Sequence, residues 1–161
     1  MPADVRLLPM TPEEYDRFVD RSVPAYARSN VEAGRWSTAE SERLAREEFA
    51  RILPQGRETP DQFFFQIHGP APGKVVGRLW LALMRRTATP IAYVYDIEID
   101  PEFRRLGFAE AALRAAEGIA RAHGADRMML NVFGTNHGAQ ALYEKLDYRV
   151  SALAMVKRLP T

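Results

Sequence analysis

The chain has 161 residues, of which 47% are apolar and 27% charged, and this composition is typical of a single globular domain covering residues 1–161. The 22 Lys and Arg residues nearly balance the 21 Asp and Glu residues, which excludes the broad basic face that nucleic-acid binding requires. The absence of cysteine excludes disulfides, thiolate metal sites and a cysteine nucleophile. No apolar run reaches the roughly 20 residues of a membrane span, and no signal peptide is visible, so we expect a cytoplasmic protein.

The N-terminal third predicts a strand followed by two helices. Alternating apolar residues predict a strand near 4–8. Thr11 and Pro12 have the residue types of a helix start, and Ser37 with Glu40 has the spacing of a capping box that opens a second helix, which Pro54 ends. Residues 26–36 are expected to connect the two helices.

The remainder of the chain alternates strands with helices. Residues 62–68 and 74–84 predict a β-hairpin, and residues 91–99 a third strand. A helix is expected from the turn at 104–109 to about His123, with Gly124 placed to end it. A strand at 128–133, a short helix beginning after Asn136 and a last strand at 149–157 complete a mixed sheet with helices on its faces.

The segment Arg104-Arg-Leu-Gly-Phe-Ala109 has the residue types of a phosphate-binding turn. A helix N-terminus exposes unpaired N–H groups, and Gly107 would let a phosphate oxygen approach the backbone closely. Arg104 and Arg105 add guanidinium donors. The alternative is an ordinary strand-to-helix turn with two surface arginines.

A second segment, Asn136 to Leu146, carries an asparagine and a tyrosine seven residues apart, so both can face one groove of a helix. The hydroxyl of Tyr143 could protonate a departing thiolate. The alternatives are a core-facing aromatic at Tyr143 and a plain helix cap at Asn136.

Together these segments resemble the GCN5-related N-acetyltransferase (GNAT) superfamily. The resemblance runs from Ile91 to Tyr148 and rests on Tyr-Asp-Ile-Glu-Ile-Asp-Pro-Glu-Phe-Arg-Arg-Leu-Gly-Phe-Ala and on Ala-Leu-Tyr-Glu-Lys-Leu-Asp-Tyr. It implies an α/β GNAT fold with a mixed central sheet of six or seven strands and helices on both faces. The parallel strands 91–99 and 128–133 would part at their C-terminal ends.

The resemblance also implies acetyl-CoA as the donor and coenzyme A as the product. Tyr143 would be the general acid, Asn136 would hold the pantetheine arm from one side, and the strand and turn would bind the rest of the cofactor. The cofactor-binding residues are then Ile97, Glu98, Ile99, Arg104, Arg105, Leu106, Gly107, Phe108, Ala109, Asn136 and Tyr143.

Two positions depart from the family pattern. Asp147 stands where the family usually has a helix-ending glycine, and Asp tolerates the left-handed conformation needed there. Asn131 stands where some members carry a glutamate base, so the base must lie elsewhere.

Asp96 and Glu98 are the candidate bases, and Glu98 is preferred; the alternative is that Glu98 only pairs with a neighbouring arginine or faces solvent. Alternation places both on one side of the strand, opposite Tyr95, unless a β-bulge intervenes. Tyr93 and Tyr95 would line the acceptor pocket. Tyr26 and Trp36 could form another wall of that pocket, or Trp36 could simply pack before the second helix. The three histidines show no ligand spacing, so no metal site is expected.

The expected reaction is direct transfer of an acetyl group to a primary amine of a small molecule. Two alternatives stay open, which are acetylation of a protein or peptide amine and a non-catalytic acyl-CoA sensor. No nucleic-acid or membrane partner is expected, and a homodimer is compatible with the sequence.

Overall fold

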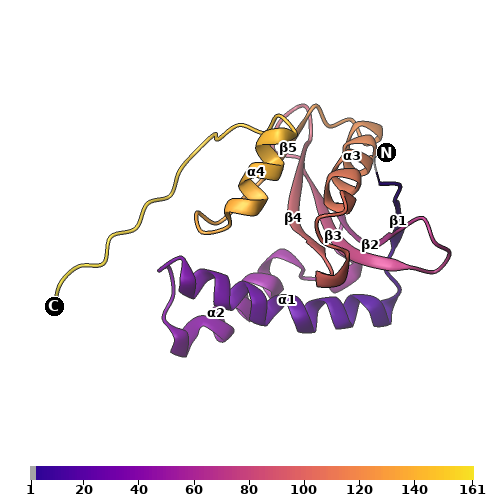
Figure 1. Cartoon of the computed structure of the whole chain (residues 1–161). Coiled ribbons are helices and arrows are strands. Elements are labelled where there is room, and N and C mark those ends of the chain that lie inside the picture. Colours follow the sequence, from indigo (N-terminus) through magenta and orange to yellow (C-terminus); the bar gives the residue numbers. More distant parts are fainter. Residues whose placement is uncertain (1–2) are drawn as a thin grey trace. The chain divides into compact units, whose positions relative to one another are not determined.

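The computed structural model describes residues 3–161 (Figure 1). The chain divides into two compact units. The first unit contains the described part of Met1–Tyr15 together with Arg57–Asn131. The second unit contains Asp16–Gly56 together with Val132–Thr161. Each unit is therefore built from two stretches that are distant in the sequence.

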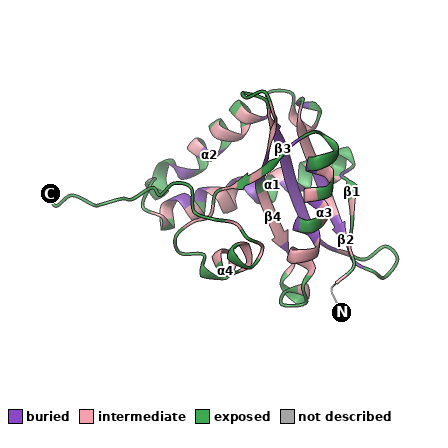
Figure 2. Ribbon diagram, turned by 90° about the horizontal axis from the view of Figure 1, so that it is seen from above, coloured by how far each residue is buried: buried purple, intermediate pink, exposed green. Residues whose placement is uncertain are grey.

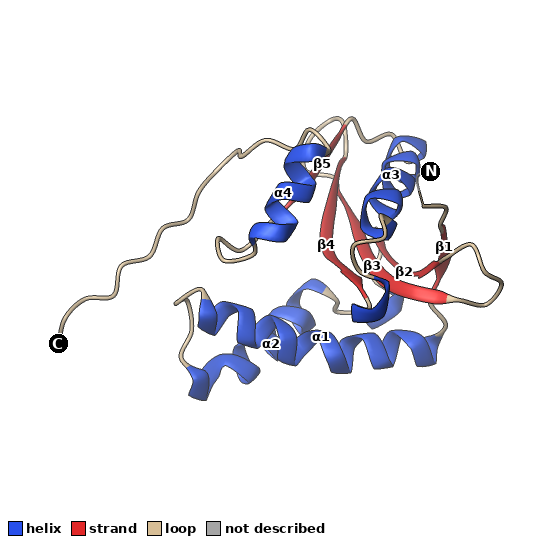
Figure 3. Ribbon diagram, in the orientation of Figure 1, coloured by secondary structure: helices blue, strands red, loops and turns tan. Residues whose placement is uncertain are grey.

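A five-stranded mixed sheet forms the centre of the first unit (Figure 3). The strands follow chain order, and every neighbouring pair is antiparallel except the last, β4 with β5, which is parallel. The mixed α/β architecture confirms the predicted fold class. The sheet has five strands among the described residues, however, and not the expected six or seven. The strands are β1 (Arg6–Pro9), β2 (Gln62–His68), β3 (Val75–Met84), β4 (Ile91–Ile99) and β5 (Arg127–Leu130).

The β2–β3 hairpin lies where the sequence predicted it, with Gln62 opposite Ala82 and Ile67 opposite Gly77. Eight consecutive residues of β3, from 76 to 83, are buried (Figure 2). A strand buried on both faces reads as a continuous apolar run, which explains why β3 lacks polar alternation.

Helix α3 (Phe108–Ala122) packs against the sheet and contacts β1, β3 and β4. Its buried face consists of small residues around one leucine, so the helix can approach the strands closely. Gly124 follows the helix with φ of +86°, which confirms it as the residue that ends α3. The buried residues of the helix are Ala112, Leu113, Ala116 and Ala120.

Helix α1 (Pro12–Glu32) begins with the capping signal expected from the sequence. The backbone N–H of Thr11 donates to Glu14 Oε2 at 2.8 Å, and the N–H of Glu14 donates to Thr11 Oγ1 at 3.3 Å. The helix then continues through Pro24, so the connection expected at 26–36 is largely helical. Burial of its inner face outweighs the low helix propensity of Pro24 and of Asn30, which is fully buried.

The second unit also contains α2 (Thr38–Ile52) and α4 (His137–Lys145). Val23 and Ala27 of α1 form a buried cluster with Ala45 of α2. The strand expected at 149–157 is absent, and these residues are extended and exposed (Figures 2 and 3). Within residues 3–161, no helix is both long enough and apolar enough to cross a membrane.

Candidate active site

A β-bulge at Tyr95 determines which side chains of β4 share a face. Trp80 is opposite Asp96, whereas Leu81 is opposite Val94, so Tyr95 is the extra residue on β4. The ring of Tyr95 stacks on that of Trp80 with centroids 4.4 Å apart. Tyr95 therefore shares a face with Asp96, and the side expected for it from simple alternation is wrong.

Tyr93 belongs to the same face, because it lies opposite Ala82, two residues from Trp80 along β3. Its ring centroid is 4.6 Å from that of Tyr95. Trp80 is 3% exposed and donates through Nε1 to Gln62 Oε1 at 2.7 Å. The bulge thus collects two tyrosines and the β4 carboxylates on one face of the sheet.

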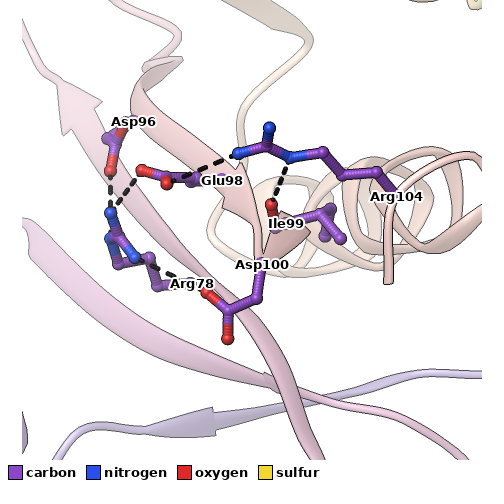
Figure 4. Close-up of polar contacts among 6 residues, drawn as sticks. All are labelled: Arg78, Asp96, Glu98, Ile99, Asp100 and Arg104. Atoms are coloured by element: carbon purple, nitrogen blue, oxygen red, sulfur yellow. Dashed lines mark hydrogen bonds and ion pairs between the residues drawn. The ribbon is translucent and has the colours of Figure 1, made fainter. Parts of the chain in front are cut away.

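Arg78 organises the carboxylates of this face (Figure 4). Its side chain is only 10% exposed, and its Nη2 donates to Glu98 Oε2. Its Nε lies 3.8 Å from Asp96 Oδ2, and its Nη1 lies 3.9 Å from Asp100 Oδ1. A buried guanidinium requires compensating negative charge, and the three acids at alternate positions of the chain supply it.

The pKa of Asp96 is raised above the usual value of an aspartate. Burial raises the pKa of Asp96 to about 6; the positive charge of Arg78 lowers that pKa, and the negative charge of Glu98 raises it. Its side chain nevertheless keeps 34% of its surface, so solvent reaches one side of the carboxyl group. Asp96 is therefore a carboxylate that can exchange a proton near neutral pH.

The parallel ladder between β4 and β5 covers only the first part of β4. It begins at Ile91 with Arg127 and ends at Val94 with Leu130. Among the described residues, 95–99 have no strand partner on the β5 side, because β5 ends at Leu130. The backbone edge that the family resemblance assigns to the pantetheine arm is thus outside the ladder.

The turn that follows β4 has the backbone geometry of an anion site. After a short 3₁₀ turn (Pro101–Phe103), Arg105 and Gly107 adopt left-handed φ angles of +64° and +84°. Gly107 is the N-cap of α3, and it has no side chain that could cap the first N–H groups of the helix. Left-handed residues beside a helix N-terminus orient backbone N–H groups toward one anion.

Two details of this turn differ from the sequence argument. A Cβ at Gly107 would meet only Ala3, at 3.7 Å, so the glycine serves the left-handed backbone rather than relieving crowding within the protein. The side chain of Arg104 is directed back to β4, where Nε donates to the Ile99 carbonyl at 3.0 Å and Nη2 lies 3.9 Å from Glu98 Oε1 (Figure 4).

In the second unit, Asn136 and Tyr143 occupy α4 as the sequence predicted. Asn136 caps the helix by accepting from the Ala139 N–H at 3.2 Å. Tyr143 lies two turns along and is partly buried, with its ring centroid 5.6 Å from that of Tyr148. Asp147 has φ of +65°, which confirms that it tolerates the left-handed position usually filled by glycine.

Tyr26 and Trp36 pack together rather than standing alone on a connection. Their rings meet edge to face with centroids 5.5 Å apart, and Tyr26 also lies 6.0 Å from the ring of Phe49. Both pack on the α1–α2 core cluster. This arrangement corresponds to the second interpretation of Trp36, in which the ring packs before the helix.

Arg78 and Gly77 were not predicted from the sequence as site residues. Arg78 is the charged residue inside the apolar run 75–84. The acids at positions 96, 98 and 100 are the feature of the sequence that could have identified it as their partner. Gly77 lies against β4 so closely that an added Cβ would be 2.2 Å from the Glu98 carbonyl oxygen. Among the described residues, no group of three or more His, Asp and Glu side chains could hold a metal ion.

Comparison with known proteins covers both units. A profile described as the Acetyltransferase (GNAT) family matches residues 26–148. In Bacillus subtilis (strain 168), an uncharacterized N-acetyltransferase named YdgE is 31% identical over 150 residues, covering 93% of this chain and 95% of that protein. A second one, YycN, is 30% identical over 155 residues, covering 96% and 99%.

Solved structures similar to this chain include two acetyltransferases. The crystal structure of YycN from Bacillus subtilis superposes with a TM-score of 0.92 at 29% identity, covering 98% of this chain and all of that one. An aminoglycoside acetyltransferase from an uncultured soil metagenomic sample, in complex with sisomicin, has a TM-score of 0.61 at 15% identity over 97% of each chain, which is a likeness of fold. With a family profile over residues 26–148 and relatives of about the same length, the chain belongs to the GNAT family of acetyltransferases.

Proposed function

We propose that this acetyltransferase moves an acetyl group from acetyl-CoA to a primary amine of a small molecule, by direct transfer within a ternary complex. The observation that carries the proposal is the shared face of β4, where Asp96, with its pKa near 6, lies beside Tyr93 and Tyr95. Aromatic faces and carboxylates together suit a cationic amine.

The residues present fit acetyl-CoA. Backbone groups of 97–99 lie beyond the β4–β5 ladder, and the start of α3, where Gly107 provides no side-chain cap and the turn is left-handed, suits a pyrophosphate. Bound there, acetyl-CoA would supply an acetyl thioester. Asn136 and Tyr143 on α4 would bind from their own unit, with the Tyr143 hydroxyl as the donor of a proton to the departing sulfur.

Asp96 is the better candidate for the general base. An amine with a pKa of about 10.4 must lose a proton before it attacks, at a cost of about 4.6 kcal/mol at pH 7. Glu98, the preference from sequence, already pairs with Arg78 and faces Arg104, so its oxygens are engaged by cations. Asp96 is farther from Arg78, at 3.8 Å, and its pKa of about 6 lies close to the pH at which a base works best.

Direct transfer is favoured because the chain contains no cysteine to form an acyl-enzyme thioester. The proposal is tested by following coenzyme A release with a panel of polyamines, aminoglycosides, amino acids and peptides. Turnover with a small amine, absent without it, is the expected result. If calorimetry shows tight acetyl-CoA binding but no amine is consumed, the proposal that the protein is an enzyme is refuted. Turnover with peptides alone would show that the acceptor is a protein or peptide amine.

A further inference from the structure

Arg104 begins the turn that leads into α3, but its side chain is directed back to the end of β4 (Figure 4). Its Nε donates to the carbonyl oxygen of Ile99 at 3.0 Å, and its Nη2 lies 3.9 Å from Glu98 Oε1. The side chain keeps 55% of its surface. A hydrogen bond made by an exposed guanidinium can be exchanged for one to water or to another acceptor at little cost, so this contact is replaceable.

The carbonyl that Arg104 contacts faces away from β3. The N–H of Asp100 donates to the carbonyl of Val76 on β3 at 2.9 Å. In a trans peptide the C=O and the N–H point in opposite directions, so the carbonyl of Ile99 is directed to the other side of β4. The N–H of Ile99 points the same way, because the Glu98 carbonyl of that peptide lies against Gly77 of β3.

On that other side, the ladder between β4 and β5 ends before it reaches Ile99. Its last pair is Val94 with Leu130, where β5 also ends. The N–H and C=O of Ile99 therefore belong to the backbone edge that would bind the pantetheine arm under the proposed function. Arg104 occupies the carbonyl acceptor of this edge with its own guanidinium.

We propose that Arg104 makes this edge selective for donors that carry a pyrophosphate, an inference that rests on the proposed binding of acetyl-CoA. With a pyrophosphate in the turn of Arg105 and Gly107, Arg104 gains an anionic acceptor. Phosphate oxygens accept from a guanidinium more strongly than a neutral carbonyl does. Arg104 then releases the Ile99 carbonyl to the amide groups of the pantetheine arm. A thioester without phosphates must instead compete with Arg104 for that carbonyl.

The neighbouring ion pair permits this release. Glu98 accepts a hydrogen bond from Arg78, whose side chain is only 10% exposed (Figure 4). The contact of Glu98 with Arg104, at 3.9 Å, is longer than a hydrogen bond. When Arg104 leaves, Glu98 therefore keeps its hydrogen-bonded cation, and no carboxylate of this group is left without a positive neighbour.

Titrations with acetyl-CoA and with acetyl-pantetheine test the selectivity, because acetyl-pantetheine has the thioester and the arm but neither pyrophosphate nor nucleotide. Arg104→Met removes the guanidinium and keeps a long, flexible side chain. It should raise the affinity for acetyl-pantetheine about threefold to tenfold, since one hydrogen-bond acceptor is uncovered, without raising the affinity for acetyl-CoA.

Arg114→Met is the matched control, because it removes the same charge from a side chain that is 60% exposed, against 55% for Arg104. It should leave both affinities within about twofold, since the exposed pair of Arg114 with Glu110 contributes little. An affinity of the Arg104→Met protein for acetyl-pantetheine that is unchanged, lower or too weak to measure overturns the inference, and so does an equal gain in Arg114→Met. These outcomes leave the proposed function intact if the parent binds acetyl-CoA. A parent that binds no acetyl-CoA contradicts the proposed function itself.

Nuclear magnetic resonance gives a second measurement that requires no turnover. Scalar coupling through the hydrogen bond between the labelled Nε of Arg104 and the labelled carbonyl carbon of Ile99 is expected in the ligand-free protein. It should disappear on saturation with acetyl-CoA, and also with inorganic pyrophosphate alone. Absence of the coupling before any ligand is added, or its persistence in the protein saturated with acetyl-CoA, overturns the inference.

Discussion

Arg78 and Glu98 are direct partners in the β3–β4 ladder, and the guanidinium of Arg78 donates to the carboxylate of Glu98. The same guanidinium lies within 4 Å of Asp96 and of Asp100, at 3.8 and 3.9 Å. One buried cation therefore contacts three acids of the proposed active site, and its removal should change the positions of all three and raise the pKa of Asp96.

Replacing Arg78 with Met removes the positive charge that lowers the pKa of Asp96. With that charge gone, the pKa should rise further above about 6, and the acid limb of kcat/KM should move to higher pH. The profile is measured between pH 5 and 9. Arg78→Lys, which keeps the charge, is the control. An acid limb that stays in place in the Met variant would show that Asp96 does not set it.

Asp96→Asn and Glu98→Gln distinguish the two candidate bases with nearly isosteric changes. Asp96→Asn should lower kcat by about 10²–10⁴-fold and abolish the acid limb, because the proton acceptor is lost. Glu98→Gln should cost at most about tenfold, since it weakens the pair with Arg78 and leaves the base in place. The reverse ranking of the two rates would return the base to Glu98.

The local elements of this fold were predictable because their signals lie within a few residues of sequence. The helix start at Thr11, the β2–β3 hairpin and the glycine after α3 each rest on short-range chemistry, and the structure has all three. The turn of Arg105 and Gly107 before α3 was found in the same way.

The sequence-based predictions that were wrong concern properties that depend on strand pairing and on packing. The bulge at Tyr95 is a matter of register between β3 and β4, which sequence spacing does not determine, and it reversed the side assigned to Tyr95. Residues 26–36 were expected to connect two helices, but burial of the inner helix face continues α1 to Glu32. The apolar pattern at 149–157 was recognised as a strand, but a strand requires a partner, and the described chain supplies none.

Tyr143→Phe should lower kcat by about 10²–10⁴-fold while acetyl-CoA affinity changes little, because only the hydroxyl proton donor is removed. Tyr148→Phe removes the hydroxyl of the neighbouring ring, whose centroid is 5.6 Å away, and should keep most of the turnover. Steady-state rates and calorimetric affinities are compared for both. Equal loss in the two variants would point to packing of the ring pair instead of proton donation.

Gly107→Val should weaken acetyl-CoA binding at least tenfold. A β-branched residue is strained at φ of +84°, at a cost of about 1–3 kcal/mol, and its side chain would stand beside the N–H groups at the start of α3. Calorimetry on the folded variant measures the affinity. Gly73→Val serves as the control, since Gly73 also has a positive φ, of +71°, but lies in the β2–β3 loop. Normal binding by a folded Gly107→Val protein would remove the turn from the phosphate site.

Gly77→Ala and Gly118→Ala should change stability in opposite directions. A Cβ at Gly77 would lie 2.2 Å from the Glu98 carbonyl oxygen and 3.0 Å from Ile99 Cα, so β3 and β4 must separate at about 1–3 kcal/mol or more. Gly118 is inside α3, and a Cβ there would meet nothing within 4 Å, so alanine should stabilise the helix by about 0.5–1 kcal/mol. Urea unfolding measures both changes. Because Gly77 borders the strand that carries Asp96 and Glu98, its variant should also lose turnover, whereas Gly118→Ala should keep it. A Gly77→Ala protein with parental stability and turnover would mean that the close approach of β3 and β4 does not constrain the active site.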